Sequence, residues 1–259
     1  MRQREGNGMK MIGLVIHLER ATARRAVAMR LVEECGLPAQ LLAAVDGRSL
    51  SPAIIEARLL RDPIHPVFPH ALRAGEVGCF LSHRLAWQSL LESDADAALI
   101  LEDDAALGPE FPAALRLAAR NLGAQSPASP SSSAMGYIQF QTRLLRNQTA
   151  LDAEGPCQLY QPIVTPLRTT GQLVNRRAAE HLLELTWRFD RPVDTFLQMH
   201  WHTGLRLACI APSGLSDVSA VSGGSTLKLR HNFGDRLSRE WNRFRYRRAV
   251  QRASAKAVQ

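Results

Sequence analysis

The sequence has few cysteines and few aromatic residues, and it has no long apolar run. Its four cysteines lie far apart in the 259-residue chain and form no CxxC pair, which argues against a disulfide framework or a zinc finger and predicts a reducing, cytoplasmic compartment. Aromatic residues make up 6% of the chain, so the core must consist mostly of aliphatic side chains. No run approaches the roughly 18 apolar residues of a membrane-spanning helix, and we expect no signal peptide.

Basic residues are concentrated at one end of the chain. The net charge is +8, and residues 228–259 hold ten basic and two acidic residues, so this segment carries the whole excess and residues 1–227 sum to zero. A neutral body gives no reason to expect nucleic acid as a partner. The tail places Leu237, Trp241, Phe244 and Val250 among arginines, which is typical of an amphipathic helix on an anionic membrane. The alternative is a helix that packs its apolar stripe on the body.

The phosphate-binding patterns GxGxxG and Walker A are absent from the sequence, so any nucleotide must be held in another way. What is present is an alternation of apolar runs and helical periodicities. Strands are predicted at 11–18, before 46, at 97–101, 136–145, 169–174 and 206–214, with one further short strand within 156–167; helices are predicted at 24–35, 51–60, 82–92, 111–123 and from 175. This order predicts one α/β domain over 9–227, with a mostly parallel sheet flanked by helices, followed by the basic tail over 228–259. The Ser/Pro-rich segment 124–134 is predicted to be a surface loop.

The most informative stretch is 75–104. GEVGCF reads as a glycine turn, and Ser82 and His83 then open a helix, where free N–H groups would meet a phosphate. AALIL at 97–101 is apolar without alternation, which predicts a strand covered on both faces. It ends in Glu102, Asp103 and Asp104, at the edge where open α/β sheets bind ligands.

Three adjacent carboxylates repel one another unless a positive charge lies nearby. Mn²⁺ or Mg²⁺ takes oxygen ligands from a few carboxylates and from substrate phosphates. Because alternate residues at a strand end point to the same side, Glu102 and Asp104 are the predicted metal ligands. Asp103 is predicted to contact the bound nucleotide. The alternative is a solvated acidic loop before the next helix. His200 and His202 flank Trp201 and are candidates for a third ligand, since they would point the same way in a strand.

Polar residues after the other strands complete the candidate site. His17, Arg20, Arg24 and Asp46 follow the first two strands and are predicted to contact the diphosphate, ribose or base of a nucleotide. Arg20 and Arg24 can instead be a solvated helix face, and Asp46 a turn residue before a glycine. Asp194 follows a proline and is the candidate general base; its alternative role is a helix N-cap. Cys79 is predicted to be a packed small residue.

The order of these motifs resembles glycosyltransferase family 25, the lipooligosaccharide-biosynthesis glycosyltransferases. The resemblance rests on VIHLERATARR at 15–25, AAVDG at 43–47, AGEVGCFLSHRLAWQSLLE at 74–92, ALILEDDA at 98–105 and PVDTFL at 192–197. Two patterns differ: His17-Leu18-Glu19-Arg20 stands where the family has Asn-Leu-Asp-Arg. The segment Arg168-Thr169-Thr170-Gly171-Gln172 stands where the family has Gly-Thr-x-x-Tyr.

The resemblance implies a GT-A-type fold, a UDP-sugar donor (commonly UDP-galactose), a Mn²⁺-type cation and inversion at the anomeric carbon. It also implies a saccharide acceptor, lipid-linked or part of lipopolysaccharide, and hence an enzyme on the inner face of the cytoplasmic membrane. Two alternatives use other chemistry. A metal-dependent phosphoesterase would use the same carboxylates with water as the nucleophile, and a non-catalytic relative would bind saccharide or membrane without turnover.

Overall fold

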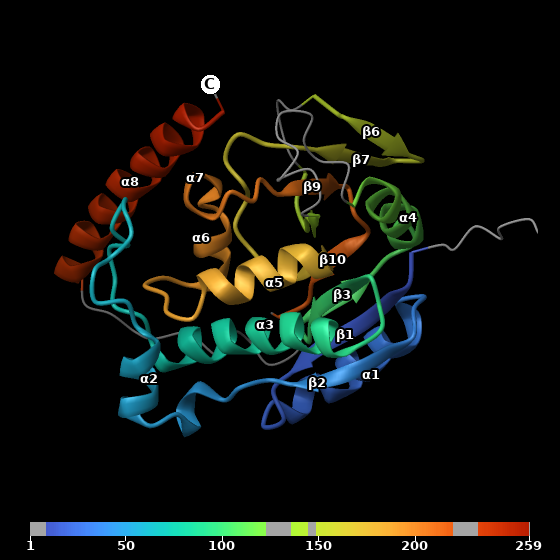
Figure 1. Ribbon diagram of the computed structural model, residues 1–259, viewed down its shortest axis with the longest axis horizontal. Coiled ribbons are helices and arrows are strands. Elements are labelled where there is room, and N and C mark those ends of the chain that lie inside the picture. The colour runs from blue at the N-terminus through green and yellow to red at the C-terminus, as the bar shows by residue number, and fades with distance from the viewer. Residues whose placement is uncertain (1–8, 123–135, 145–148, 220–232, 259) are drawn as a thin grey trace, which may run out of the picture.

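The computed structural model of the protein describes residues 9–122, 136–144, 149–219 and 233–258, with side chains of the last segment described from residue 240. Within them, one large sheet is covered by helices on both faces, and α8 (Phe233–Lys256) lies along one side (Figure 1). The predicted α/β class with a C-terminal helix is confirmed. The predicted loop at 124–134 and the predicted boundary at 228 lie outside the described residues.

The large sheet has the strand order β2-β1-β3-β8-β5-β9-β7-β6. Its strands are β1 (Met11–His17), β2 (Ala39–Ala43), β3 (Ala97–Glu102), β5 (Tyr137–Phe140), β6 (Asp152–Glu154), β7 (Cys157–Tyr160), β8 (Gly171–Asn175) and β9 (Ala208–Ala211). Six of these eight strands run in one direction, whereas β8 and β7 run against it. The carboxyl ends of β1, β2 and β3 therefore meet at one edge, and the start of β8 lies beside the end of β3.

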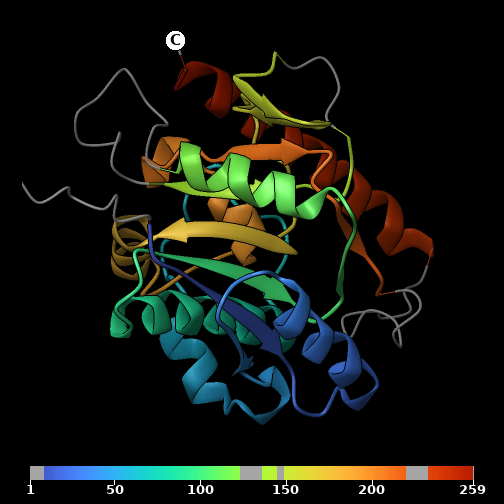
Figure 2. The same ribbon diagram turned by 90° about the vertical axis from the view of Figure 1, so that its right-hand side faces the viewer.

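Two hydrophobic clusters, one on each face of the sheet, form the core. Ile100 of β3 packs into one cluster with α3 (Ala74–Glu92), α5 (Arg176–Leu185) and α6 (Val193–Leu197). Leu99 of the same strand packs into the other with α1 (Arg25–Glu34) and α4 (Phe111–Asn121), which lie on the near side of the sheet in Figure 2. Both side chains are fully buried, each contributing roughly 1.5–3 kcal/mol to folding. The predicted strand with two covered faces is confirmed.

The glycine-rich start of the central motif is helical, which corrects the predicted turn. Helix α3 begins at Ala74, where the Glu76 carboxylate accepts a hydrogen bond from the Arg73 N–H. A Cβ on Gly78 would lie 2.6 Å from the Val45 oxygen, and a Cβ on Gly47 would lie 1.9 Å from the Ala74 oxygen. Both glycines are thus required because the helix backbone touches the turn after β2.

Several short elements of the structure were not predicted from the sequence. A second, two-stranded sheet pairs β4 (Ala105–Leu107) with β10 (Leu215–Asp217), and β6 forms a hairpin with β7. The helix α7 (His200–Thr203) and the 3₁₀ turns η1 (Thr22–Arg24) and η2 (Gly47–Ser49) were also missed, whereas α2 (Pro52–Arg58) confirms the helix predicted at 51–60. Strands of three residues carry too little alternation to be recognised in sequence. His200 and His202 lie in α7, so the predicted strand there is wrong.

Helix α8 is attached to the body by Tyr246, which lies off the predicted stripe, and by one residue of that stripe, Val250. Tyr246 contacts Phe68 edge to face and accepts a hydrogen bond from Arg191, and Val250 is buried. Trp241 and Phe244, which the sequence grouped with Val250, are 61% and 48% exposed. Leu237 lies outside the described side chains. The helix therefore packs on the body and also leaves an aromatic pair at the surface.

Candidate active site

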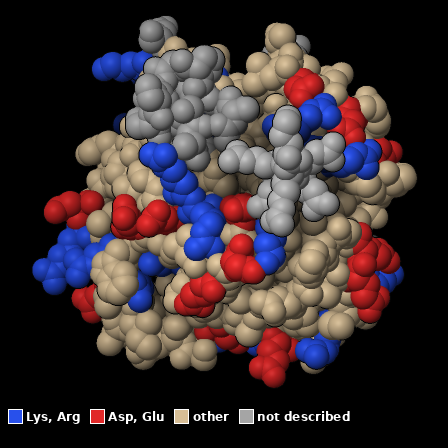
Figure 3. Space-filling model, turned by 45° about the vertical axis from the view of Figure 1, so that its right-hand side comes forward, with Lys and Arg blue, Asp and Glu red and all other residues tan. Residues whose placement is uncertain are grey.

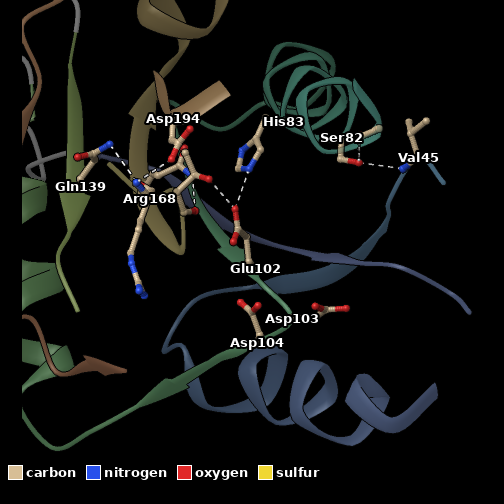
Figure 4. Close-up of polar contacts among 12 residues, drawn as sticks. Val45, Ser82, His83, Glu102, Asp103, Asp104, Gln139, Arg168 and Asp194 are labelled. Carbon is tan, nitrogen blue, oxygen red and sulfur yellow. Dashed lines mark hydrogen bonds and ion pairs between the residues drawn. The ribbon is translucent and has the colours of Figure 1, made fainter. Parts of the chain in front are cut away.

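The three carboxylates after β3 point in different directions, because the chain turns at Asp103 and Asp104 (Figure 4). Glu102 lies 3.1 Å from His83 Nε2 and accepts a hydrogen bond from the Thr169 hydroxyl at 2.6 Å. Asp103 is buried and contacts His17 Nδ1 at 2.8 Å and Arg24 Nη1 at 2.9 Å. Asp104 lies 3.5 Å from the Arg24 guanidinium. Asp103 and Asp104 thus approach the same Arg24 guanidinium, whereas Glu102 is held by His83 and Thr169; that Glu102 and Asp104 share one cation stays a prediction.

A first cavity of about 680 Å³ opens at the carboxyl ends of β1 and β2, beside α3. Four arginines reach it, together with the acidic residues after β3. Its charged lining residues are Arg20, Arg24, Arg48, Arg73, Glu102, Asp103 and Asp104. Such a row of guanidinium groups beside carboxylates suits a diphosphate with a bridging cation.

A second cavity of about 770 Å³ lies on the other side of Glu102 and Asp104. It is lined by Asp194 and by the segment 167–170, and α8 forms part of its wall. Arg73, Cys79, Glu102 and Asp104 line both cavities. The two cavities therefore meet at the predicted metal ligands, and each is large enough for a small ligand.

Asp104 is the carboxylate best placed to take a cation. Burial, followed by the charge of Glu102, raises its pKa to about 7, against the opposing effect of Arg24. Burial would also raise the pKa of Glu102, but hydrogen bonds from His83 and Thr169 hold it below its usual value. A carboxylate crowded by like charge at an open cavity has the electrostatics and the oxygen donors that suit Mn²⁺ or Mg²⁺.

Asp194 lies in the first turn of α6, inside the second cavity. It accepts hydrogen bonds from the Thr195 N–H at 2.7 Å and from the Arg168 N–H at 3.3 Å. Burial nevertheless raises its pKa, which suits a group that takes up a proton during a reaction. The N-cap of α6 is Pro192, so the alternative role of Asp194 as a helix cap is excluded.

The other predicted donor contacts divide into two groups. Arg20, Arg24, Ser82, His83 and Asp103 line the first cavity, whereas His17 and Asp46 do not appear in its wall. Asp46 caps η2 by accepting the Arg48 N–H, and a hydrogen bond from Arg20 lowers its pKa. This arrangement supports the turn role that the sequence left open.

Ser82 and His83 lie in the middle of α3 rather than at its start, so the predicted helix N-terminus at these residues is wrong. The Ser82 hydroxyl donates to the Gly78 carbonyl and accepts from the Val45 N–H. The Ser82 side chain therefore holds the segment after β2 against α3. His200 and His202 line neither cavity, and His200 Nε2 lies 3.1 Å from the Ile163 carbonyl.

The cavity walls also contain residues that no sequence pattern indicated. Cys79 opens onto both cavities and is exposed, which corrects its predicted packed role. Arg73, Thr169 and Asp217 come from three separated segments. Thr169 falls in the altered family pattern at 168–172, which is the sequence signal for it, whereas nothing local marks Asp217.

Arg168 has a strained backbone beside Asp194. Its φ is +98°, the only positive value at a non-glycine residue in the described segments. The family pattern has glycine here, which adopts such angles freely. The Arg168 side chain donates a hydrogen bond to Asp217 at 2.6 Å, and both residues line the second cavity.

We expect Arg168→Gly to be more stable than Arg168→Ala by about 1 kcal/mol. Both variants lose the guanidinium, but only alanine keeps the strained backbone, which costs about 1–2 kcal/mol. Glycine loses part of this advantage, because its larger unfolded-state entropy lowers the stability of the folded variant. Urea unfolding of the two variants measures the difference, and equal midpoints would show that the backbone here is not strained.

Comparison with known proteins gives the family. The model of glycosyltransferase family 25 (LPS biosynthesis protein) matches residues 11–197. A glycosyltransferase 25 family member of Drosophila melanogaster is 38% identical over 100 residues, 38% of this chain and 16% of that protein. Human procollagen galactosyltransferase 2 is 30% identical over 100 residues, with the same two coverages. Mouse inactive glycosyltransferase 25 family member 3 is 36% identical over 100 residues, 38% of this chain and 17% of that protein.

The chain thus spans about a sixth of the length of these curated relatives. A solved glycosyltransferase involved in glycosylation of the major capsid of PBCV-1 has a TM-score of 0.34 and 14% identity, covering 69% of this chain and 65% of that one. The family match extends over β1, the α3 motif, the acidic end of β3 and Asp194. The chain belongs to glycosyltransferase family 25.

Proposed function

We propose that the protein transfers a hexose, most simply galactose, from a UDP-sugar to a saccharide acceptor, with inversion and with the aid of Mn²⁺ or Mg²⁺. The galactose assignment is supported by similar proteins named procollagen galactosyltransferases. The observation that carries the proposal is the pair of cavities that meet at Glu102 and Asp104, with Asp194 on the far side. One cavity takes the donor and the other the acceptor.

On the donor side, the diphosphate gains negative charge as the sugar leaves. Arg20, Arg24 and Arg73 line this cavity and stabilise that charge electrostatically. Glu102 and Asp104 would hold the cation, which when bound supplies further positive charge to the departing oxygen. Asp103 fixes Arg24 through a 2.9 Å contact and so sets the position of one of these guanidinium groups.

On the acceptor side, the attacking hydroxyl must lose its proton. Asp194 lines the second cavity and not the first, and burial raises its pKa, so it binds that proton more readily than an exposed aspartate. The Thr195 and Arg168 N–H groups hold its oxygens in place. A single displacement follows: the acceptor oxygen bonds to the anomeric carbon, the proton goes to Asp194, and UDP leaves.

A panel of nucleotides and nucleotide sugars, tested by thermal shift with and without Mn²⁺, examines the donor assignment. We expect UDP and UDP-galactose to raise the melting temperature only with Mn²⁺, since ligands that bind the native state stabilise it. Absence of any nucleotide shift would overturn the proposal. Because one similar protein is named inactive, turnover is measured separately: UDP release that needs an added saccharide supports transfer, and release without one supports a phosphoesterase.

For the acceptor, we propose a lipid-linked or lipopolysaccharide saccharide and a peripheral position on the inner face of the cytoplasmic membrane. The support is the family description and the outer face of α8. That face is made of Trp241, Phe244, Arg245, Arg248 and Arg252, all exposed. Trp241 and Phe244 stack at 5.9 Å, and Arg248 lies over the Phe244 ring. Interfacial aromatics among arginines suit an anionic lipid surface. In the described part of the chain, no helix is long and apolar enough to span a bilayer.

The triple variant Arg245→Gln, Arg248→Gln, Arg252→Gln is expected to lose binding to vesicles that contain phosphatidylglycerol. At about 1 kcal/mol per arginine, three changes weaken binding roughly 100-fold. Co-sedimentation measures it, with phosphatidylcholine vesicles as the neutral surface.

A matched control removes the same charge from the body, at the exposed residues Arg25, Arg30 and Arg61. Acidic and basic side chains are interspersed on the face seen in Figure 3, and residues 1–227 carry no net charge, so we expect this control to bind vesicles like the unchanged chain. If the body variant lost vesicle binding as strongly as the α8 variant, α8 would have no special role in membrane binding.

A further inference from the structure

Three side chains of different chemistry come together where the two cavities meet. Cys79 and His83 lie one turn apart on α3, and Glu102 ends β3. One ligand atom from each, the Cys79 sulfur, a His83 ring nitrogen and a Glu102 oxygen, lies within 4.8 Å of the other two. His83 points at Glu102 (Figure 4), with 3.1 Å between Nε2 and Oε1. We propose that this triad binds a thiophilic divalent cation, Zn²⁺ or Cd²⁺, and that its occupation blocks the donor site.

The geometry is close to that of a three-ligand zinc site. Zn–S bonds of about 2.3 Å and Zn–N or Zn–O bonds of about 2.0–2.2 Å place neighbouring ligand atoms roughly 3.3–3.6 Å apart. The His83–Glu102 pair, at 3.1 Å, is already close to this spacing, and the Cys79 sulfur, within 4.8 Å of both ligand atoms, reaches it by a side-chain movement of about 1 Å or less. The helix fixes Cys79 and His83 on one face, since residues four apart are neighbours there.

The surroundings of the triad also favour a cation. The Thr169 hydroxyl donates to Glu102 at 2.6 Å and orients it, as partners of metal ligands commonly do. Cys79 and Glu102 line both cavities, so the fourth coordination position is open to water or to a phosphate oxygen. Asp104 and Asp194 add negative charge to the second cavity.

Charge and protons balance in the binding step. The Cys79 thiol releases its proton to water as the sulfur–metal bond forms, and His83 binds through Nε2 with its proton on Nδ1. One thiolate, one carboxylate and one neutral imidazole carry two negative charges, which the divalent cation neutralises. Nothing is oxidised or reduced.

This site differs in chemistry from the proposed Mn²⁺ site but shares Glu102 with it. Mn²⁺ prefers oxygen ligands, whereas sulfur and imidazole favour Zn²⁺, and Zn²⁺ generally binds mixed sites more tightly than Mn²⁺ does. A bound Zn²⁺ therefore withdraws Glu102 from the donor's cation. The blocking effect rests on the proposed function; the binding itself does not.

Titration of the reduced full-length protein with CdCl₂ tests the site directly. We expect a thiolate-to-cadmium charge-transfer band that saturates at one ion per chain. Cys79→Ser should remove the band and weaken Zn²⁺ binding about 100-fold or more, measured by competition with a chromophoric chelator; His83→Gln should weaken it about 10–100-fold. Cys35→Ala, which removes a buried thiol from the other face of the sheet, is the control and should keep both signals.

Alkylation of the unchanged protein covers the case in which a variant fails to fold. Iodoacetamide should label Cys79 before the other three cysteines, because those are buried, although desolvation and the nearby carboxylates raise the pKa of the Cys79 thiol and slow its reaction. Bound Zn²⁺ should protect Cys79 by at least about 10-fold. A cadmium band that survives Cys79→Ser, or labelling of Cys79 that Zn²⁺ leaves unchanged, overturns the proposal.

The two proposals fail in different ways. If the unchanged protein does not bind Zn²⁺ but shows the Mn²⁺-dependent UDP shift, only this inference is refuted. If it binds Zn²⁺ but shows no UDP shift, only the transferase assignment is refuted. If both hold, saturating Zn²⁺ should abolish the Mn²⁺-dependent UDP shift. A UDP shift unchanged by bound Zn²⁺ would contradict the blocking effect.

Discussion

Asp194→Asn is expected to lower kcat for sugar transfer by about 10²–10⁴-fold while leaving the Mn²⁺-dependent UDP shift unchanged. An amide cannot take up the acceptor proton, and general-base catalysis is worth a factor of this size. Asp194 lines the second cavity and is absent from the wall of the first. Its loss should therefore leave donor binding intact.

The pH profile gives an independent readout of the same residue. Burial raises the pKa of Asp194, and a base acts only when it is deprotonated. We therefore expect kcat/KM to fall as the pH drops through that raised pKa, and the acid limb should disappear in Asp194→Asn. A variant that kept kcat within 10-fold of the unchanged chain would place the base elsewhere. Asp62→Asn, at an exposed site, controls for the loss of one acidic charge.

Asp104→Ala is expected to abolish the metal-dependent part of the UDP thermal shift. Asp104 lines both cavities, and its raised pKa records crowding that a cation would relieve. Removing a metal ligand eliminates Mn²⁺ stabilisation of the nucleotide complex. Asp104→Asn keeps the volume of the side chain and should lose the same part of the shift. A shift unchanged in both variants would remove Asp104 from the site.

Protonation of Asp104 should also make the stability of the metal-free protein depend on pH. The folded-state pKa of about 7 lies above the ordinary 3.8, so the native state holds this proton more tightly than the unfolded chain does. The stabilisation is complete below the unfolded value and is lost as the pH rises through about 7. Without metal, the melting temperature of the unchanged protein should fall across this window relative to Asp104→Asn. With Mn²⁺ and UDP, the shift should be larger above pH 7 than below it, because the cation takes the place of the proton.

Much of the architecture follows from local patterns. The runs MIGLVIH and AALILE are strands with two covered faces, because each buries alternate side chains against helices on both sides. The helical periodicity at 111–121 is α4, and the proline at 192 stands directly before α6. Short strands such as β4 and β10 were missed, since their pairing joins residues more than 100 positions apart.

The glycine motif shows where local reasoning fails. GEVGCF has the composition of a turn, and glycine lowers helix propensity. In the structure Gly78 lies within α3 because the helix backbone touches Val45 and Gly47. This contact overrides propensity, and it moves Ser82 and His83 from the expected helix start to its middle.

The sequence by itself determined the fold class, the family and the place where three carboxylates end a buried strand, because strand periodicity and motif spacing are properties of neighbouring residues. Only the tertiary structure decided which of these carboxylates faces both cavities: Asp103 is held by His17 and Arg24 and lines only the first, while Glu102 and Asp104 line both. It also decided that Cys79 and His83 meet Glu102 and that α8 forms a wall of the second cavity. These contacts join segments far apart in the chain, and the packing of helices on the sheet, rather than any local pattern, brings them together.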